Sequence, residues 1–124
     1  AHGISYLEST GLLESPGKPV VVCSLGDGSV TEGEVSAAFQ MAVLKKLPII
    51  YLVQDNQWGI SAFADEMRAM DAYEFAGGFK GMKRMRADGT DFIDSYKKFG
   101  EALEYARTKR KPMAISTSLT TLPR

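Results

Sequence analysis

Residues 25–61 read LGDGSVTEGEVSAAFQMAVLKKLPIIYLVQDNQWGIS, and this stretch decides the fold. One apolar run, Pro19–Leu25, leads into it, and a second, Pro48–Val53, lies inside it. Neither run alternates with polar residues, which is typical of strands covered on both faces of a parallel sheet. Between the runs, apolar residues recur at helical spacing, namely Val35, Ala38, Phe39, Ala42 and Val43. The stretch therefore predicts a strand–helix–strand unit with a right-handed crossover, and with it an open, mainly parallel α/β sheet flanked by helices.

Polar residues follow both predicted strands. Asp27 stands between two glycines after the first strand, and Asn56 follows the second strand, 29 residues later. Ligands of open α/β sheets bind outside the carboxyl ends of the strands, so we expect the two side chains to lie side by side. A carboxylate oxygen and an amide oxygen suit Mg²⁺ or Ca²⁺, and phosphate oxygens and water can complete the coordination. We also expect a capping box of Thr31 and Glu34 at the helix start, where free backbone N–H groups form an anion site.

The same stretch resembles a known family. Gly-Asp-Gly at residues 26–28, followed by Asn56 after an apolar strand, resembles the thiamine diphosphate motif. Residues 26–61 as a whole resemble the alpha part of the decarboxylating component of 2-oxo acid dehydrogenase complexes, which act on pyruvate or branched-chain 2-oxo acids. Residues 87–91, ADGTD, resemble the VDGND segment of the same family. The resemblance covers nearly the whole chain from about Pro19 onward, and it implies the thiamine diphosphate-binding fold.

The resemblance also implies which residues form the site. Asp27 and Asn56 match the family's magnesium-binding residues. Trp58 stands where the backbone carbonyl of an aromatic residue completes the metal site, and Gly28 and Ser29 match the residues whose backbone N–H groups meet the diphosphate. The implied cofactors are thiamine diphosphate and Mg²⁺.

Only half of the catalytic site is expected in this chain. In the family, a glutamate on a second domain or subunit hydrogen-bonds the aminopyrimidine of the cofactor, and no residue here is assigned to that role. Glu32 and Glu34 are interpreted as residues of the helix start. We therefore predict no catalytic residue in this chain, weak cofactor binding by the chain alone, and no activity of the chain alone. Asp55 stands where many relatives carry asparagine; it precedes the metal ligand, so we expect little loss of metal binding.

The resemblance implies several partners. A beta subunit or a fused beta half would supply the other half of the site, a lipoyl acyltransferase component would receive the acyl group, and a small 2-oxo acid would be the substrate. Relatives work as tetramers of two alpha and two beta subunits or as dimers of fused chains, so we expect an oligomer. The interface left open by a missing partner would expose apolar surface, which we place around Phe39, Met41 and Phe63.

Composition excludes other classes of partner. Lys plus Arg and Asp plus Glu number 15 each, so no net field attracts nucleic acid or a membrane surface. Cys23 is the only cysteine, which excludes an intrachain disulfide, and its place in an apolar strand predicts a buried thiol. No run reaches membrane length and no signal peptide is visible, so we expect a cytoplasmic protein. The 124 residues begin with Ala-His, and we interpret residues 1–124 as a fragment of a longer chain that holds part of one domain; His2 is interpreted as structural or exposed.

The remaining residues predict the rest of the sheet. Residues 71–79 predict a helix that stops at Gly77-Gly78, and the basic residues of the run 83–86 predict a solvated strand edge. Residues 91–109 form the clearest helix, and residues 113–119 the last strand. We count four strands and four helices. The buried side of the long helix is predicted to consist of Ile93, Tyr96, Phe99 or Gly100, Leu103 and Ala106.

Three other hypotheses remain open. A transketolase-like domain shares the Gly-Asp-Gly turn and the later asparagine, although the residues between them and the ADGTD segment favour the dehydrogenase. A non-catalytic phosphate-binding module would keep the glycine turn but need no metal. In the least specific alternative, the chain is an α/β domain whose glycine turn serves only the fold.

Overall fold

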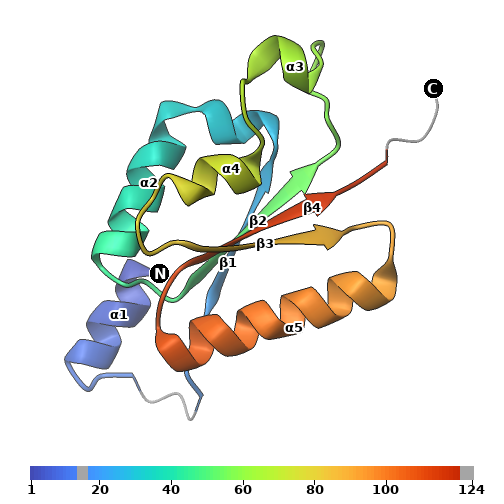
Figure 1. The fold of residues 1–124 in the computed structure, drawn as a ribbon. Helices are drawn as coiled ribbons and strands as arrows, with labels where there is room; N and C mark the ends of the chain where they lie inside the picture. Colours follow the sequence, from blue (N-terminus) through green and yellow to red (C-terminus); the bar gives the residue numbers. More distant parts are fainter. Residues whose placement is uncertain (14–16, 121–124) are drawn as a thin grey trace.

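The sheet of this protein contains four strands, all parallel, in the order β1-β2-β4-β3. We describe residues 1–13 and 17–120 of a computed structural model, shown in Figure 1. The strands are β1 (Val21–Gly26), β2 (Ile49–Asp55), β3 (Lys83–Asp88) and β4 (Met113–Ser118). The open parallel α/β class and the count of four strands are thus confirmed, and each predicted strand agrees to within two residues at either end.

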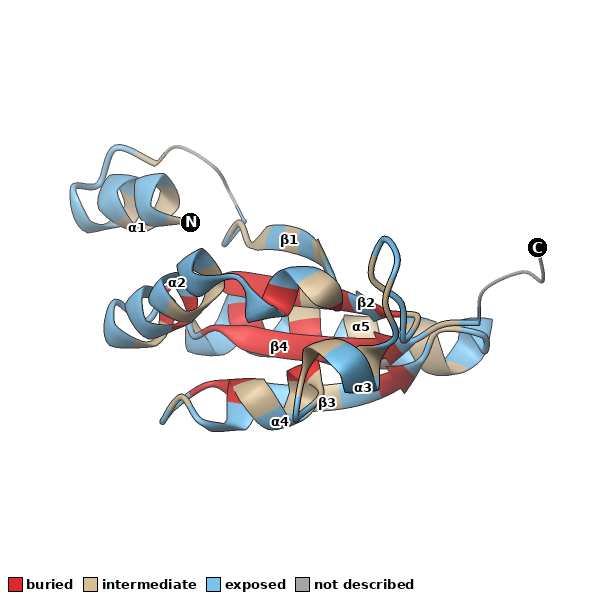
Figure 2. Ribbon diagram, turned by 90° about the horizontal axis from the view of Figure 1, so that it is seen from above, coloured by how far each residue is buried: buried red, intermediate tan, exposed pale blue. Residues whose placement is uncertain are grey.

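Helices cover both faces of this sheet. The described residues form a 3₁₀ helix, η1 (Gly28–Thr31), and five α-helices, one more than predicted: α1 (His2–Ser9), α2 (Gly33–Leu44), α3 (Ala64–Met67), α4 (Ala72–Gly77) and α5 (Phe92–Lys109). Figure 1 shows α2 and α4 on one face of the sheet and α5 on the other. Figure 2 shows that β4, in the middle of the sheet, is buried along almost its whole length.

The core under α2 and α4 is built around Phe39. The Phe39 ring is 1% exposed, and its centroid lies 4.6 Å from that of Tyr51, 5.3 Å from that of Phe79 and 6.0 Å from that of Phe75. Ala42 of α2 and Ala76 of α4 are fully buried in the same cluster. The prediction that Phe39 belongs to an exposed interface is therefore wrong, because this ring joins α2, α4 and β2. Met41 and Phe63, the other two members of that predicted surface, are exposed.

The core under α5 is formed by small residues facing large ones. Ala102 and Ala106 are fully buried against Ile50, Met113 and Ile115 of the sheet. Phe99 and Leu103 pack against this cluster. Ile93 and Tyr96 were predicted to be buried but are 62% and 73% exposed. At the start of α5 it is Ser95 that faces the sheet, where its hydroxyl donates to the Asp88 carbonyl at 2.8 Å.

The two edge strands differ in their protection. Strand β3 carries Lys83, Arg84 and Arg86 as exposed residues, as predicted. The guanidinium groups of Arg84 and Arg86 lie 4.3 and 4.4 Å from the ring centroid of Tyr73. On β1, burial alternates, and Val22 is 44% exposed. The prediction that both faces of this strand are covered is wrong for β1, because β1 lies at the edge of the sheet and no described helix covers the Val22 face. For the same reason Cys23 is half-buried and not buried.

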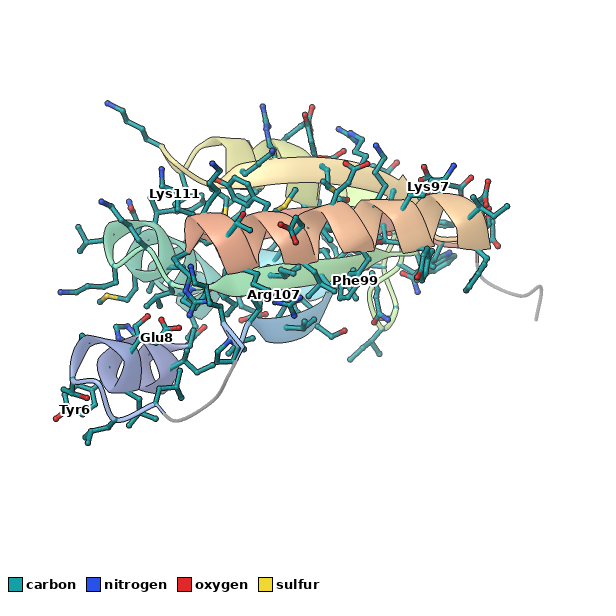
Figure 3. The ribbon with its side chains drawn as sticks, turned by 90° about the horizontal axis from the view of Figure 1, so that it is seen from below. Tyr6, Glu8, Lys97, Phe99, Arg107 and Lys111 are labelled. Carbon is teal, nitrogen blue, oxygen red and sulfur yellow. The ribbon has the colours of Figure 1, made fainter. Side chains whose placement is uncertain are left out.

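Helix α1 lies beside the body of the fold and contributes no buried residue. It is attached through Arg110, which follows α5 and forms an ion pair with Glu8 and donates to the Pro19 carbonyl at 3.0 Å. Figure 3 shows Glu8 on the side of α1 that faces α5. His2 is exposed on this helix. No helix in the described part of the chain is long and apolar enough to cross a membrane.

We expect Asp71→Ala to lower the free energy of unfolding by about 1 kcal/mol at pH 7. Asp71 caps α4: one carboxylate oxygen accepts from the Glu74 N–H at 2.8 Å, and the other pairs with Arg86 at 2.6 Å. Partial burial acts to raise the pKa of Asp71, but the Glu74 N–H and the Arg86 guanidinium outweigh it and hold the pKa below its usual value.

This stabilisation by Asp71 therefore depends on pH. A depressed pKa in the folded state contributes stability above the unfolded pKa, about 4, and that contribution is lost as the pH falls through the folded value. Urea unfolding of the wild type and Asp71→Ala at pH 7 and at about pH 3 should show the difference shrinking in acid. A difference that stays constant with pH would contradict the ionic part of this account.

Candidate functional site

A cavity of about 670 Å³ lies at the carboxyl edge of the sheet. Gly26 at the end of β1 pairs with Gln54 near the end of β2, so the loops that follow the two strands start side by side. All five residues predicted for the site line this cavity: Asp27, Gly28, Ser29, Asn56 and Trp58. The structure thus brings the two predicted strand ends together at one cavity.

The loop after β1 forms one wall of the cavity. The Asp27 N–H donates to the Gln54 carbonyl at 3.2 Å, which extends the strand pairing by one residue. The chain then turns into η1, whose first hydrogen bond runs from the Val30 N–H to the Asp27 carbonyl at 3.2 Å. The N–H groups of Gly28 and Ser29 come before that first bond, so they have no acceptor within the turn and are free for an anion.

The expected capping box is absent. The Thr31 hydroxyl donates to the Gly28 carbonyl at 2.8 Å, inside η1. Helix α2 begins at Gly33, with Glu32 in the N-cap position and no side-chain cap. The prediction of Thr31 and Glu34 as a capping pair is wrong because the 3₁₀ turn occupies Thr31 and shifts the start of α2 beyond it.

The segment after β2 is fixed by its own side chains. Asp55 Oδ1 accepts from the backbone N–H of Gln57 at 3.1 Å and from its side-chain Nε2 at 2.8 Å, while Asn56 Oδ1 accepts from the Trp58 N–H at 3.0 Å. Gln57 adopts a φ of 64°, in the left-handed region that non-glycine residues seldom occupy. These contacts hold Asn56 at the cavity, and its amide oxygen retains a second lone pair.

An apolar loop forms the opposite wall. The rings of Trp58 and Phe63 lie against each other, tilted by 37°, with centroids 3.8 Å apart, and the Gly59 N–H donates to the Ala62 carbonyl at 2.8 Å. A Cβ built on Gly28 would lie 3.9 Å from the Gly59 Cα, so the two loops approach each other closely. Trp58 and Phe63 remain 40% and 49% exposed, and they form an apolar rim beside the polar strand ends.

Arg68 supplies a buried positive charge behind the cavity. Its Nη2 lies 2.7 Å from Asp27 Oδ2 and 3.2 Å from Asp55 Oδ1, and the three side chains are 6%, 3% and 7% exposed respectively. Burial raises the pKa of Asp55 above its usual value and the nearby Asp27 charge adds to this, while the Gln57 N–H and Arg68 act against it. Sequence reasoning missed Arg68, although a buried carboxylate at a strand end requires a cation near it.

The donor set fits a magnesium ion that is shared with a phosphate. Asp27 offers one carboxylate whose Oδ2 is held by Arg68, and Asn56 and the Trp58 carbonyl offer neutral oxygens. Across residues 1–13 and 17–120 there is no cluster of three or more His, Cys, Asp or Glu side chains that could hold a metal by themselves. Mg²⁺ is commonly held by one or two carboxylates with phosphate oxygens and water, and does not need an all-protein cage.

A parallel α/β sheet with a polar cavity at the carboxyl ends of its strands defines a class of ligand-binding domains. Among solved structures, a transketolase variant from Pichia stipitis superposes with a TM-score of 0.72 at 22% sequence identity, covering 95% of this chain and 18% of that one. An enzyme from Mycobacterium smegmatis, assigned to the thiamin diphosphate-dependent class, superposes with a TM-score of 0.62 at 23% identity, covering 95% of this chain and 20% of that one. At these identities the likeness shows the fold, which is that of thiamine diphosphate-dependent enzymes.

The chain belongs to the family of dehydrogenase E1 components, whose model matches residues 15–119. It is 35% identical over 92 residues to the pyruvate dehydrogenase E1 component subunit alpha of Rickettsia conorii, covering 73% of this chain and 28% of that protein. It is 30% identical over 94 residues to the mitochondrial 2-oxoisovalerate dehydrogenase subunit alpha 1 of Arabidopsis thaliana, covering 76% of this chain and 20% of that protein. The predicted membership is confirmed, and the chain spans less than a third of either relative.

Proposed function

We propose that this chain binds thiamine diphosphate through a magnesium ion, as the diphosphate-binding part of a 2-oxo acid dehydrogenase. The observation that carries the proposal is the meeting of Asp27 and Asn56 with the N–H groups of Gly28 and Ser29 on one cavity. A cation site beside an anion site is what a magnesium-bound diphosphate requires. The membership of the chain in the E1 family supports the same cofactor.

Each residue of the site would have a distinct role. Asp27, the Asn56 amide oxygen and the Trp58 carbonyl would hold the metal. The backbone N–H groups of Gly28 and Ser29, at the start of η1, would bind the diphosphate oxygens. When bound, thiamine diphosphate supplies a nucleophilic carbon that stabilises the charge left by decarboxylation, and the protein binds, orients and shields it.

The complete reaction requires residues outside this chain. No residue of the described cavity is assigned to the aminopyrimidine of the cofactor, so a beta subunit or a fused beta half would supply that wall. The assembled enzyme would oxidatively decarboxylate a branched-chain 2-oxo acid or pyruvate and pass the acyl group to lipoamide on the acyltransferase component. The relatives named for pyruvate and for 2-oxoisovalerate support these two substrates about equally.

Cofactor binding can be tested in the full protein that carries this chain, assembled with its partner. Thiamine diphosphate with Mg²⁺ should raise the melting temperature; at a hundredfold excess over Kd the stabilisation is about 2.7 kcal/mol. Thiamine diphosphate with a chelator should not do so. Equal stabilisation by ADP with Mg²⁺ would contradict the proposal and favour a general phosphate-binding module.

The substrate class can be tested with the same protein. Release of CO₂ from carboxyl-labelled pyruvate and from 3-methyl-2-oxobutanoate, with an artificial electron acceptor, should be found for at least one of them. The transketolase alternative rests on a shared fold at 22% identity. Transfer of a two-carbon unit between sugar phosphates, without turnover of either 2-oxo acid, would favour that alternative.

A further inference from the structure

We infer that Arg68 and Asp55 act as a positioning pair that fixes the carboxylate of Asp27 for the metal. This inference rests on the proposed function, in which Asp27 is the only carboxylate in the metal site. Arg68 touches Asp27 through Oδ2 alone, at 2.7 Å, and Asp27 also lines the cavity. The guanidinium therefore orients the carboxylate through one oxygen and leaves the other oxygen to the cavity.

Arg68 itself lies behind the cavity and not in it. It does not line the 670 Å³ cavity; it lines a separate cavity of about 210 Å³ together with Asp71 and Glu74. The diphosphate would bind on the other side of Asp27. This placement distinguishes a positioning residue from an arginine that binds the diphosphate directly.

Asp55 completes the pair by balancing the charge of Arg68. Its Oδ1 lies 3.2 Å from the same Nη2 and is itself fixed by the Gln57 N–H at 3.1 Å. Without Asp55, Arg68 would be paired with Asp27 alone, and its positive charge would offset more of the negative charge that Asp27 offers to a divalent cation. This inference departs from the expectation that Asp55 has little effect on the metal: its carboxylate faces Arg68, and through Arg68 it would act on Asp27.

The second nitrogen of the guanidinium supports a role beyond folding. Arg68 Nη1 is buried and has no hydrogen-bond partner among the described residues. A buried donor without a partner is costly, so its retention calls for an explanation such as a functional role or a bound water molecule. The backbone of Arg68 is also fixed, since its N–H donates to the Ala64 carbonyl at 2.9 Å at the end of α3.

The test measures the metal requirement of cofactor binding in the full protein with its partner. Mg²⁺ is titrated at a fixed, saturating concentration of thiamine diphosphate, and binding is followed by calorimetry well below the melting temperature. Hydrogen-bonding partners of metal ligands contribute about 10- to 100-fold to metal affinity. We expect Arg68→Gln to raise the half-saturating Mg²⁺ concentration by about this factor, Arg68→Lys to restore part of the loss, and Asp55→Asn to raise it by about 10-fold.

Arg86→Gln is the matched control. Arg86 also pairs with an aspartate, at 2.6 Å from Asp71, but its side chain is 56% exposed and it does not line the 670 Å³ cavity. This variant should leave the half-saturating Mg²⁺ concentration unchanged. At saturating Mg²⁺, all variants should bind thiamine diphosphate as the wild type does, because the pair acts on the metal ligand and not on the diphosphate.

The outcomes separate this inference from the proposed function. Absence of metal-dependent binding in the wild type would remove the proposed function itself. If the wild type binds normally and Arg68→Gln requires no more Mg²⁺, the positioning role is wrong; if it requires less, Arg68 competes with the metal. Should Arg68→Gln fail to fold by circular dichroism, Asp55→Asn, which keeps the side-chain shape, decides in the same way.

Discussion

Asp27→Asn is expected to abolish the magnesium dependence of thiamine diphosphate binding. Asp27 is 3% exposed, it lines the cavity at the strand ends, and it supplies the one carboxylate of the proposed metal site. The change preserves the shape of the side chain but removes the negative charge that a hard cation requires. Because phosphate oxygens would then lose the metal that neutralises them, the cofactor should bind more than 100-fold more weakly, a loss of about 3 kcal/mol.

The measurement is a calorimetric titration of thiamine diphosphate with and without Mg²⁺. Asp88→Asn provides the control, because Asp88 also ends a parallel strand but is exposed and is held by Thr90, whose side chain and N–H lower the pKa of Asp88. This control should retain the full response to Mg²⁺. An Asp27→Asn protein that still responds to Mg²⁺ would exclude Asp27 as a metal ligand.

Phe39→Ala is expected to lower the free energy of unfolding by about 3–5 kcal/mol. The ring is almost completely buried and contacts three other aromatic rings, with centroids 4.6 to 6.0 Å away. Removing it leaves a cavity between α2, α4 and the sheet that the surrounding side chains can fill only in part. Urea unfolding followed by far-UV circular dichroism measures the loss.

Phe92→Ala is the corresponding control for the aromatic core. Phe92 is 80% exposed at the start of α5, so its removal should change stability by less than about 0.5 kcal/mol. Phe39 also anchors α2, the helix that follows η1 in the chain, so Phe39→Ala should weaken cofactor binding as well as folding. A loss of less than about 1 kcal/mol for Phe39→Ala would contradict the placing of this ring at the centre of the core.

Local patterns were sufficient to predict the strand–helix–strand unit and the cavity. The apolar runs around Cys23 and Tyr51 define β1 and β2, and the glycines beside Asp27 mark the turn that leads to the site. These features depend on residues close in sequence and on the general rule that parallel strands share one carboxyl edge. Asp27 and Asn56 therefore reach the same cavity as predicted.

Features that depend on contacts between residues distant in sequence could not be predicted from local patterns. Val22 belongs to an apolar run, yet one face of an edge strand is covered only if another element reaches it. Tyr96 and Phe99 both fit a helical stripe, and the crossing of α5 over the sheet decides that Phe99 is the one that packs. Arg68 lies 41 residues from Asp27 in a polar segment without any pattern, and only the folded chain brings the two together.

The asymmetry between the two edges of the sheet has a consequence for growth of the sheet. Three basic side chains stand on β3, and an approaching strand would have to desolvate or displace them, so that border is closed to further pairing. Strand β1 carries no charged residue, and its outer backbone N–H and C=O groups face away from β2. Any additional strand, whether from the same polypeptide or from another, would therefore pair with β1. The sheet can gain strands only at this edge.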